Sequence, residues 1–207
     1  MDDGAEALAA IRGYLDERRG DERGLEVVPL SGDASTRRYY RLSGPGQAYV
    51  VALYPEPFDP ATAAFLVVGA LLEGYGLPVP RVVDVDGSRG IVLQEDLGDC
   101  TLQQALRDCS ERRSAEMYQE AVGALVRLQR EAGRGPQSAE CFRIAFDIEK
   151  LSWELHYFQK HFLEGLRGCD LGVEDRATLS EAFHQLSAEI ASWPRVLCHR
   201  DYHSRNL

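Results

Sequence analysis

Four side chains that could do chemistry together fall within eight residues of the sequence: His199, Asp201, His203 and Asn206. The carboxylate of Asp201 can orient an acceptor hydroxyl and take its proton late in a transfer reaction. Asn206, five residues further on, can turn back across a short loop and offer its amide oxygen to Mg2+. We expect His199 to brace the loop through hydrogen bonds. These residue types predict a site where a hydroxyl is activated beside a divalent cation.

The order of these residues is more specific than their types. His-Arg-Asp at 199–201, followed by four residues and Asn206, is typical of the catalytic loop of kinases that move the γ-phosphoryl group of ATP to a hydroxyl. Such a transfer depends on positioning and charge neutralisation. The pattern predicts an ATP-dependent phosphotransferase in which Asp201 is the catalytic residue and Asn206 is a ligand of Mg2+.

Three other interpretations of this stretch stay open. His, Asp and Asn are common in loops, so the spacing can arise by chance. His199, Asp201 and His203 could be metal ligands on one face of a strand, as in a metal-dependent hydrolase, although nearby segments supply no further ligands at close spacing. Cys198 and His199 could form a nucleophile and base pair, but adjacent strand residues rarely point at each other.

Composition narrows the class of protein. Of 207 residues, 44% are hydrophobic and 27% charged, as in globular proteins that bury a substantial core. The net charge of −10 argues against a nucleic-acid-binding surface. The longest apolar run, over 61–72, is too short to span a bilayer. The five cysteines form no Cys-x-x-Cys pair and no signal peptide is recognisable. We therefore expect a cytoplasmic protein with no nucleic-acid or membrane partner, and the sequence predicts no particular oligomeric state.

Periodicity and turn residues indicate the elements that must position the loop. In the first half we expect a helix over 5–18, strands over 25–30, 37–42 and 48–54, a helix from Pro60 to about Tyr75, and a strand hairpin over 81–85 and 91–94. In the second half we expect only helices, over 101–109, 111–131, 147–166 and 174–192.

This layout predicts the fold class α+β. A five-stranded antiparallel sheet with one helix, followed by an all-helical half, is typical of the bilobal protein-kinase-like fold. We place the boundary between the lobes at 95–99. The expected domains are a nucleotide-binding lobe over 1–95 and a partial helical C-terminal lobe over 96–207, which ends at the catalytic loop.

Two further segments fit this layout. The loop between the first two strands reads Gly32-Asp33-Ala34-Ser35-Thr36-Arg37-Arg38-Tyr39-Tyr40-Arg41, and the boundary segment reads Gln94-Glu95-Asp96-Leu97-Gly98-Asp99. Together with residues 199–206, they resemble the aminoglycoside phosphotransferase family. Within it the chain is most similar to the bacterial N-acetylmuramate/N-acetylglucosamine anomeric kinases of cell-wall recycling, in which Gly-Asp-Ala-Ser followed by Arg-Arg-Tyr is distinctive. The resemblance covers the whole chain in order.

The resemblance implies a reaction, its ligands and their sites. It implies that ATP, with Mg2+, phosphorylates the anomeric hydroxyl of an amino sugar. Backbone groups of Glu95 and Leu97 would face the adenine, with a plain acidic loop as the alternative. The helical segment 146–167 would build the acceptor pocket, although an aromatic stripe at helical spacing is more often core. The nucleotide would also meet the front loop, formed by Gly32, Asp33, Ala34, Ser35, Thr36, Arg37 and Arg38. A glycine that allows close approach, hydroxyl donors and successive N–H groups suit phosphate binding, although an ordinary turn is the alternative.

One part of the kinase pattern is missing. Such folds usually place a Lys on the third strand, paired with a Glu on the next helix. Here the strand over 48–54 has no basic residue, and the helix has no acid before Glu73. We expect an Arg to neutralise the phosphates instead, with Arg37 and Arg41 on one face of their strand and Arg38 on the other.

The resemblance also calls for an acidic metal ligand and several helices after Asn206. We therefore expect a C-terminally truncated chain with weak activity at best, in which the apolar face of the helix over 147–166 is uncovered. Two other functions stay open. One is a small-molecule kinase with another acceptor, such as an aminoglycoside or a choline-like alcohol, and the other is a non-catalytic nucleotide-binding remnant.

Overall fold

The computed structural model describes residues 3–20, 24–30, 36–135 and 137–207. Contacts divide the chain into two units, the first comprising residues 1–131 and 199–207 and the second residues 132–198. The first unit holds every strand and the predicted catalytic loop. The second holds the helices of the segment in which the acceptor pocket was expected.

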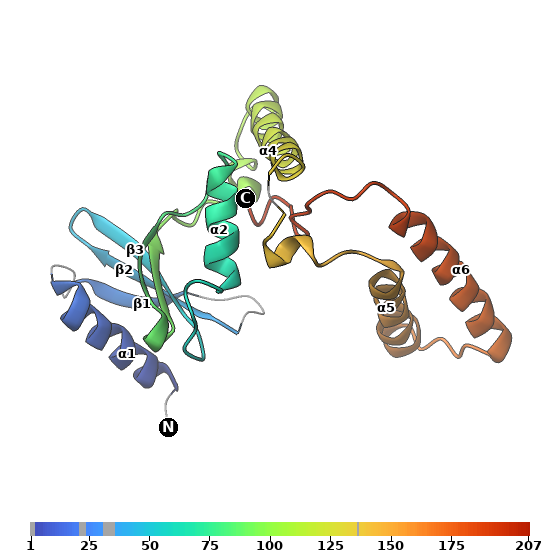
Figure 1. The fold of residues 1–207 in the computed structure, drawn as a ribbon, viewed down its shortest axis with the longest axis horizontal. Helices are drawn as coiled ribbons and strands as arrows, with labels where there is room; N and C mark the ends of the chain where they lie inside the picture. The colour runs from blue at the N-terminus through green and yellow to red at the C-terminus, as the bar shows by residue number, and fades with distance from the viewer. Residues whose placement is uncertain (1–2, 21–23, 31–35, 136) are drawn as a thin grey trace. The chain divides into compact units, whose positions relative to one another are not determined.

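A five-stranded antiparallel sheet is the centre of the first unit (Figure 1). Its strands, in the spatial order β1-β2-β3-β5-β4, are β1 (Glu26–Leu30), β2 (Arg38–Gly44), β3 (Gln47–Leu53), β5 (Ile91–Glu95) and β4 (Val82–Asp86). Valine, tyrosine and leucine dominate the central strands, which suits a pleated and largely buried surface. Gly90 closes the β4–β5 hairpin with a φ of +68°, and a Cβ there would lie 2.9 Å from the carbonyl oxygen of Tyr54.

Helix α1 (Asp3–Arg18) covers one face of this sheet. Ile11, Tyr14 and Leu15 are buried against alternate residues of the strands, among them Leu42 and Val51. The hydroxyl of Tyr14 donates to Asp84 Oδ2 at 2.8 Å, and burial together with this bond raises the pKa of Tyr14. The core of the unit therefore lies between α1 and the sheet.

The other face of the sheet looks toward the side on which helix α2 (Ala64–Gly74) lies (Figure 1). It carries Tyr39 and Arg41 of β2, which pair with Ala52 and Val50 of β3. Val50, Ala52 and Val92 are buried here without belonging to the α1 core. These residues form a second apolar cluster, on the face of the sheet opposite α1.

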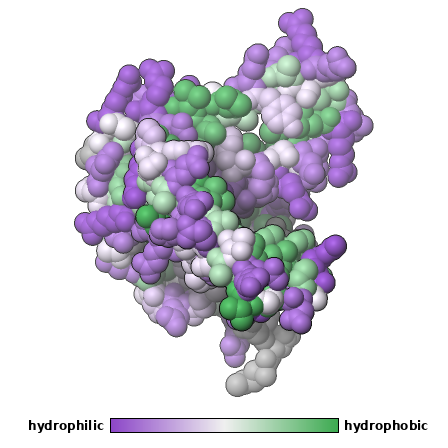
Figure 2. All heavy atoms as spheres, turned by 90° about the vertical axis from the view of Figure 1, so that its right-hand side faces the viewer, coloured by the Kyte–Doolittle hydropathy of each residue, from purple (hydrophilic) through white to green (hydrophobic). Residues whose placement is uncertain are grey.

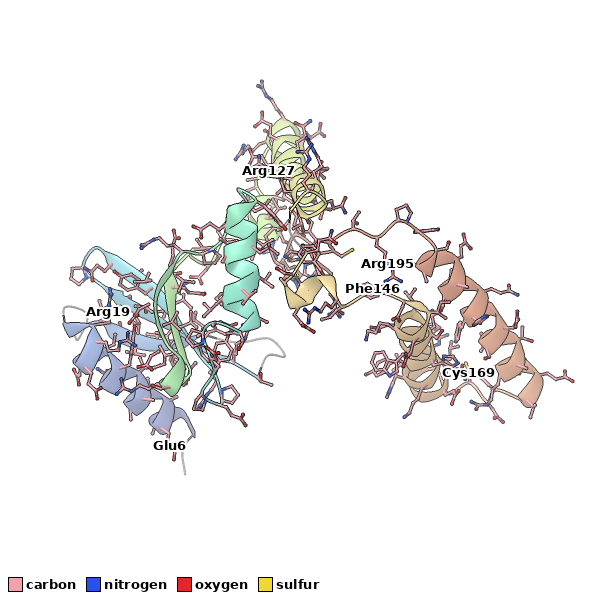
Figure 3. The ribbon with its side chains drawn as sticks, viewed as in Figure 1. Glu6, Arg19, Arg127, Phe146, Cys169 and Arg195 are labelled. Atoms are coloured by element: carbon pink, nitrogen blue, oxygen red, sulfur yellow. The ribbon has the colours of Figure 1, made fainter. Side chains whose placement is uncertain are left out.

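Helical elements complete the first unit. The short helix α3 (Leu102–Ala105) begins at Thr101, whose side chain and that of Gln104 form a capping box. Helix α4 (Glu111–Ala132) follows, and Arg127 projects from it to donate to the carbonyl of Gly76, just after α2, at 2.7 Å (Figure 3). Through this bond α4 is tied to the segment that ends α2.

The second unit is built on two helices. Helix α5 (Ile148–Phe158) continues into the π-helical segment η4 (Gln159–Leu166), and α6 (Val173–Ala191) packs beside α5. Ser152 Oγ lies 3.2 Å from Ser187 Oγ, and the ring of His156 meets Phe183 edge-on. Within 132–198, the buried residues among those described are Ala132, Phe183 and Ser187.

The structure confirms the predicted α+β class and the five-stranded antiparallel sheet. The predicted helix start at Pro60 is wrong, because Asp59 caps a turn over 59–63 and α2 begins at Ala64. The helix expected over 101–109 is limited to Leu102–Ala105, and the one expected over 147–166 changes to π-helix at Gln159. None of the described helices is long and apolar enough to cross a membrane.

Candidate active site

Asp201 is held from both of its carboxylate oxygens. Asn206 Nδ2 donates to Oδ2 at 2.8 Å and also lies 3.0 Å from the backbone oxygen of Asp201. His203 Nε2 lies 3.0 Å from Oδ1. The loop therefore closes on itself as the spacing predicts, and the carboxylate has one orientation relative to Asn206.

The hydrogen bonds of His203 indicate which ring nitrogen carries the proton. Its Nδ1 accepts from the backbone N–H of Arg205 at 3.2 Å. A neutral ring that accepts at Nδ1 carries its proton on Nε2, which then donates to Asp201. Asn206 uses its amide nitrogen in the same cluster, and these bonds leave its amide oxygen for another partner.

The loop is anchored on α3 and α4. The N–H groups of Leu102 and Gln103, in the first turn of α3, donate to the carbonyls of Leu207 and Ser204 at 2.6 and 2.7 Å. The first N–H groups of a helix have no partner within it, so the loop carbonyls satisfy them. The hydroxyl of Tyr202 donates to the carbonyl of Ala121 in α4.

The backbone beside Asp201 is strained. Arg200 has a φ of +77° and is the only non-glycine residue with positive φ in the described part of the chain. Such a conformation costs about 1 kcal/mol or more and persists only where the surroundings enforce it. Next to it, His199 meets the ring of Tyr202 edge-on at 5.2 Å, so the contact that braces His199 is aromatic. Burial raises the pKa of Tyr202.

The segment predicted to face the adenine runs from the end of β5 to α3. The N–H of Glu95 donates to the carbonyl of Arg81, and Glu95 Oε2 accepts from the N–H of Arg81. Leu97 is exposed. Asp96 Oδ1 accepts from the N–H of Gly98, whose φ is +80°. A hydrogen bond therefore joins the two neighbours of Leu97, while Leu97 itself is exposed to solvent.

The predicted phosphate-binding arginines differ in their surroundings. Arg37 lies 5.5–5.8 Å from the ring centroids of Tyr39, Tyr54 and Phe65, and its Nη1 lies 3.3 Å from the hydroxyl of Tyr54. These rings come from β2, the residue after β3, and α2, so Arg37 spans the junction where kinases usually place their Lys–Glu pair.

The register of β2 separates the other two arginines. Arg38 shares a face with Tyr40 and Leu42, which are buried in the core beneath α1. Arg41 is on the opposite face and pairs with Asp96 and Asp99. The predicted loop residues Gly32, Asp33, Ala34 and Ser35 lie outside the described residues, and Thr36 is exposed.

The alternative chemistries find less support. No group of three His, Cys, Asp or Glu side chains in the described ranges could hold a metal ion, as the hydrolase interpretation would need. The thiol of Cys198 bonds to the carbonyl of Val196. In the second unit, a shallow groove of about 430 Å³ lies between the start of α5 and the end of α6, and none of the predicted site residues lines it.

Sequence reasoning missed three contributors to the site. The carboxylates of Asp96 and Asp99 bind Arg41, and Tyr202 anchors the catalytic loop to α4. Strand alternation already placed Arg41 on the face of Arg37, but the partner acids come from a connection 55 or more residues away. No local pattern signals such a pairing.

Comparison with known proteins identifies similar sequences. The sequence model of the phosphotransferase enzyme family matches residues 26–207. N-acetylmuramate/N-acetylglucosamine kinase of Pseudomonas aeruginosa is 32% identical over 194 residues, which cover 94% of this chain and 54% of that protein. The proteins of the same name from Neisseria meningitidis and Pseudomonas putida are each 28% identical, over 90% and 94% of this chain and 54% of their own lengths. The chain spans about half the length of the curated relatives it matches.

Proposed function

Because this chain belongs to the phosphotransferase enzyme family, we propose that it takes part in ATP-dependent phosphorylation of the anomeric hydroxyl of an amino sugar. The observation that carries the proposal is the closed cluster of Asp201, His203 and Asn206 on a loop anchored to α3 and α4. Such a cluster fixes a base and a cation ligand relative to each other, which is what phosphoryl transfer requires.

In the proposed reaction, Asp201 accepts a hydrogen bond from the acceptor hydroxyl and takes its proton as the new O–P bond forms. The bond between the γ-phosphorus and the bridging oxygen breaks, and ADP leaves. His203 and Asn206 keep the Asp201 carboxylate oriented through both oxygens. The strained Arg200 peptide directs Asp201 away from a regular helical or extended path.

The donor set fits Mg2+. The Asn206 amide oxygen is a hard oxygen ligand of the kind that Mg2+ prefers, and the Asn206 amide nitrogen is already directed to Asp201. When bound, the ion neutralises charge on the phosphate oxygens of ATP.

The nucleotide is proposed to lie on the sheet face opposite α1. Val50, Ala52 and Val92 place buried apolar side chains on this face, next to the connection that carries the exposed Leu97. Arg37 is proposed to neutralise the phosphates from its position among three rings, with the loop 32–36 completing the phosphate site. In this proposal residues 1–95 form the nucleotide lobe and 96–207 part of the helical lobe.

The acceptor assignment rests on the names of the relatives, which are N-acetylmuramate/N-acetylglucosamine kinases. Exposed rings of Trp153 and Tyr157 lie 5.3 Å apart on α5, with Lys150 over Trp153 at 4.1 Å. Aromatic faces of this kind suit pyranose rings. A role in cell-wall recycling and a cytoplasmic location belong to the same proposal.

An acceptor panel tests this function. The chain is incubated with Mg2+ and ATP and with N-acetylmuramate, N-acetylglucosamine, an aminoglycoside or choline, and phosphorylated product is identified by mass and by the acid lability of an anomeric phosphate. We expect slow formation of product with the two amino sugars. Product with only the aminoglycoside or choline would mean that the acceptor is one of those compounds and not an amino sugar. Thermal stabilisation by Mg2+ and ATP without product from any acceptor would favour a nucleotide-binding remnant.

A further inference from the structure

Arg41 binds two carboxylates of the connection that follows β5. Its Nε lies 2.6 Å from Asp96 Oδ2, and Nη2 donates to Asp96 Oδ1 at 3.0 Å. Nη1 and Nη2 donate to Asp99 Oδ2 and Oδ1 at 2.7 and 2.9 Å. The guanidinium is therefore bidentate toward Asp99, an arrangement in which Arg–carboxylate pairs are specific, while Asp96 accepts one hydrogen bond from Nη2 and lies in ionic contact with Nε.

The two acids differ in exposure. The side chain of Asp96 is 8% exposed, whereas that of Asp99 is 78% exposed. An exposed ion pair contributes little by itself, but a carboxylate removed from water depends on its cation. Asp96 also accepts from the N–H of Gly98, so the pairing with Arg41 fixes the turn on which Leu97 lies. The hydrogen bonds from Arg41 lower the pKa of Asp99, which agrees with the pair being formed at neutral pH.

This connection joins the two parts of the proposed site. On one side, Glu95 is bound to Arg81 at the edge of the sheet. On the other side, Thr101 caps α3, whose first N–H groups hold the carbonyls of Ser204 and Leu207 in the catalytic loop. Arg41 is the contact that ties the middle of this connection to β2, on the sheet face that carries Val50 and Ala52.

We propose that Arg41, with Asp96 and Asp99, holds the 96–99 connection against β2 so that the backbone at Leu97 meets the adenine ring. Arg41 is thus a positioning residue for the base of the nucleotide and touches neither the base nor the phosphates. Asp96 and Asp99 occupy the guanidinium of Arg41, whereas the guanidinium of Arg37 lies against aromatic rings. The two arginines therefore have different roles in the proposal. The inference rests on the proposed function, because it requires adenine at this segment.

The experiment compares Arg41→Gln with Arg89→Gln in the full chain. Arg89 makes a matched control, since it also pairs with two acids, Glu17 and Asp86, but ties α1 to the β4–β5 hairpin. Calorimetric titration measures the affinity for Mg2+·ATP and for Mg2+·tripolyphosphate, which has the phosphates without the base. We expect Arg41→Gln to weaken ATP binding about tenfold and to leave tripolyphosphate binding unchanged. Arg89→Gln should leave both affinities unchanged.

A second variant and a second measurement guard against misfolding. Asp99→Asn removes only the exposed acid, and we expect it to weaken ATP binding about threefold with tripolyphosphate binding unchanged. Amide hydrogen exchange over 96–103 should become faster in Arg41→Gln and stay unchanged in Arg89→Gln.

Each contrary result is distinct. Equal ATP affinity in Arg41→Gln and the unaltered chain, or unchanged amide exchange over 96–103, would overturn the positioning role. A parallel loss of tripolyphosphate binding would also overturn it, since Arg41 would then be a phosphate ligand. Failure of the unaltered chain to bind ATP would instead reject the proposed function and, with it, the inference.

Discussion

The sheet region and the second unit are stabilised in different ways. In the first, α1 and the strands bury a continuous core, and ion pairs from Arg41 and Arg89 link segments that are distant in sequence. In the second, the described buried residues are Ala132, Phe183 and Ser187, while large apolar side chains of α5 and η4, such as Trp153 and Phe162, are exposed. In Figure 2, hydrophobic residues (green) reach the molecular surface among hydrophilic residues (purple).

This difference shows where the geometry of the site comes from. The candidate catalytic loop belongs to the first unit, where Tyr202 and the first turn of α3 hold it. The helices of the second unit carry exposed aromatic side chains, such as Trp153 and Phe162. In our proposal the first unit supplies the residues that carry out the chemistry. The predictions below probe this division.

The largest effect is expected at the centre of the first unit. Asp201→Asn keeps the size of the side chain and removes the base, so turnover with an amino sugar should fall by roughly a thousandfold while ATP affinity is retained. Steady-state kinetics and calorimetry measure the two quantities. Asp170→Asn, an exposed acid of the second unit, should leave turnover unchanged. A comparable loss of turnover in both variants would contradict the assignment of the chemistry to the first unit.

Amide hydrogen exchange should distinguish the two regions directly. Protection follows the free energy of local opening, which is highest for buried strands and low for elements with few buried contacts. We expect amides of β3 and β5 to exchange at least roughly a hundredfold more slowly than those of α5 and α6. Exchange mass spectrometry on the unaltered chain measures this ratio, and equal protection would show that the second unit is stabilised in a way that its burial does not indicate.

The two faces of β2 give a smaller and sharper contrast. Arg37→Ala should weaken Mg2+·ATP binding about tenfold, because the phosphates would lose the guanidinium that is held among three rings. Arg38→Ala, on the face of Tyr40 and Leu42, should change ATP affinity less than twofold. Calorimetric titration compares them, and the reverse order would move the phosphates to the other face of the strand.

The smallest effect concerns acid stability in the β4–β5 hairpin. The hydroxyl of Ser88 donates to Asp86 Oδ1 at 2.6 Å, and this bond, with Arg89, lowers the pKa of Asp86. A lowered carboxyl pKa gives stability that is present above the unfolded-state pKa and is lost as the pH falls through the folded-state pKa. Ser88→Ala should therefore cost about 1 kcal/mol at pH 7 and raise the pH at which acid unfolding begins.

Circular dichroism during acid titration measures the last effect. Ser192→Ala is a suitable control, since the Ser192 hydroxyl donates to the backbone carbonyl of Glu189 and not to a carboxylate. An unchanged acid midpoint in Ser88→Ala would mean that Asp86 does not contribute to the pH dependence of the fold.

The sequence predicted the elements that follow local rules. Alternating apolar residues indicated the strands, Gly76 and Gly90 marked real turns, and the loop spacing placed Asn206 against Asp201. The sequence prediction missed one local turn and the features that depend on tertiary contacts. Asp59 delays the start of α2, and α5 changes to π-helix at Gln159 without a proline to signal it. The pairing of Arg41 with Asp96 joins positions 55 residues apart, which no local pattern encodes.

The most direct test of the account is a crystal structure of this chain with Mg2+ and a non-hydrolysable ATP analogue. We predict the adenine on the sheet face of Val50 and Ala52, next to the backbone of Leu97, with the amide oxygen of Asn206 about 2.1 Å from the ion. The carboxylate of Asp201 should face the γ-phosphate. A nucleotide bound elsewhere, such as in the groove between α5 and α6, or an Asp201 carboxylate directed away from the phosphates, would contradict the account.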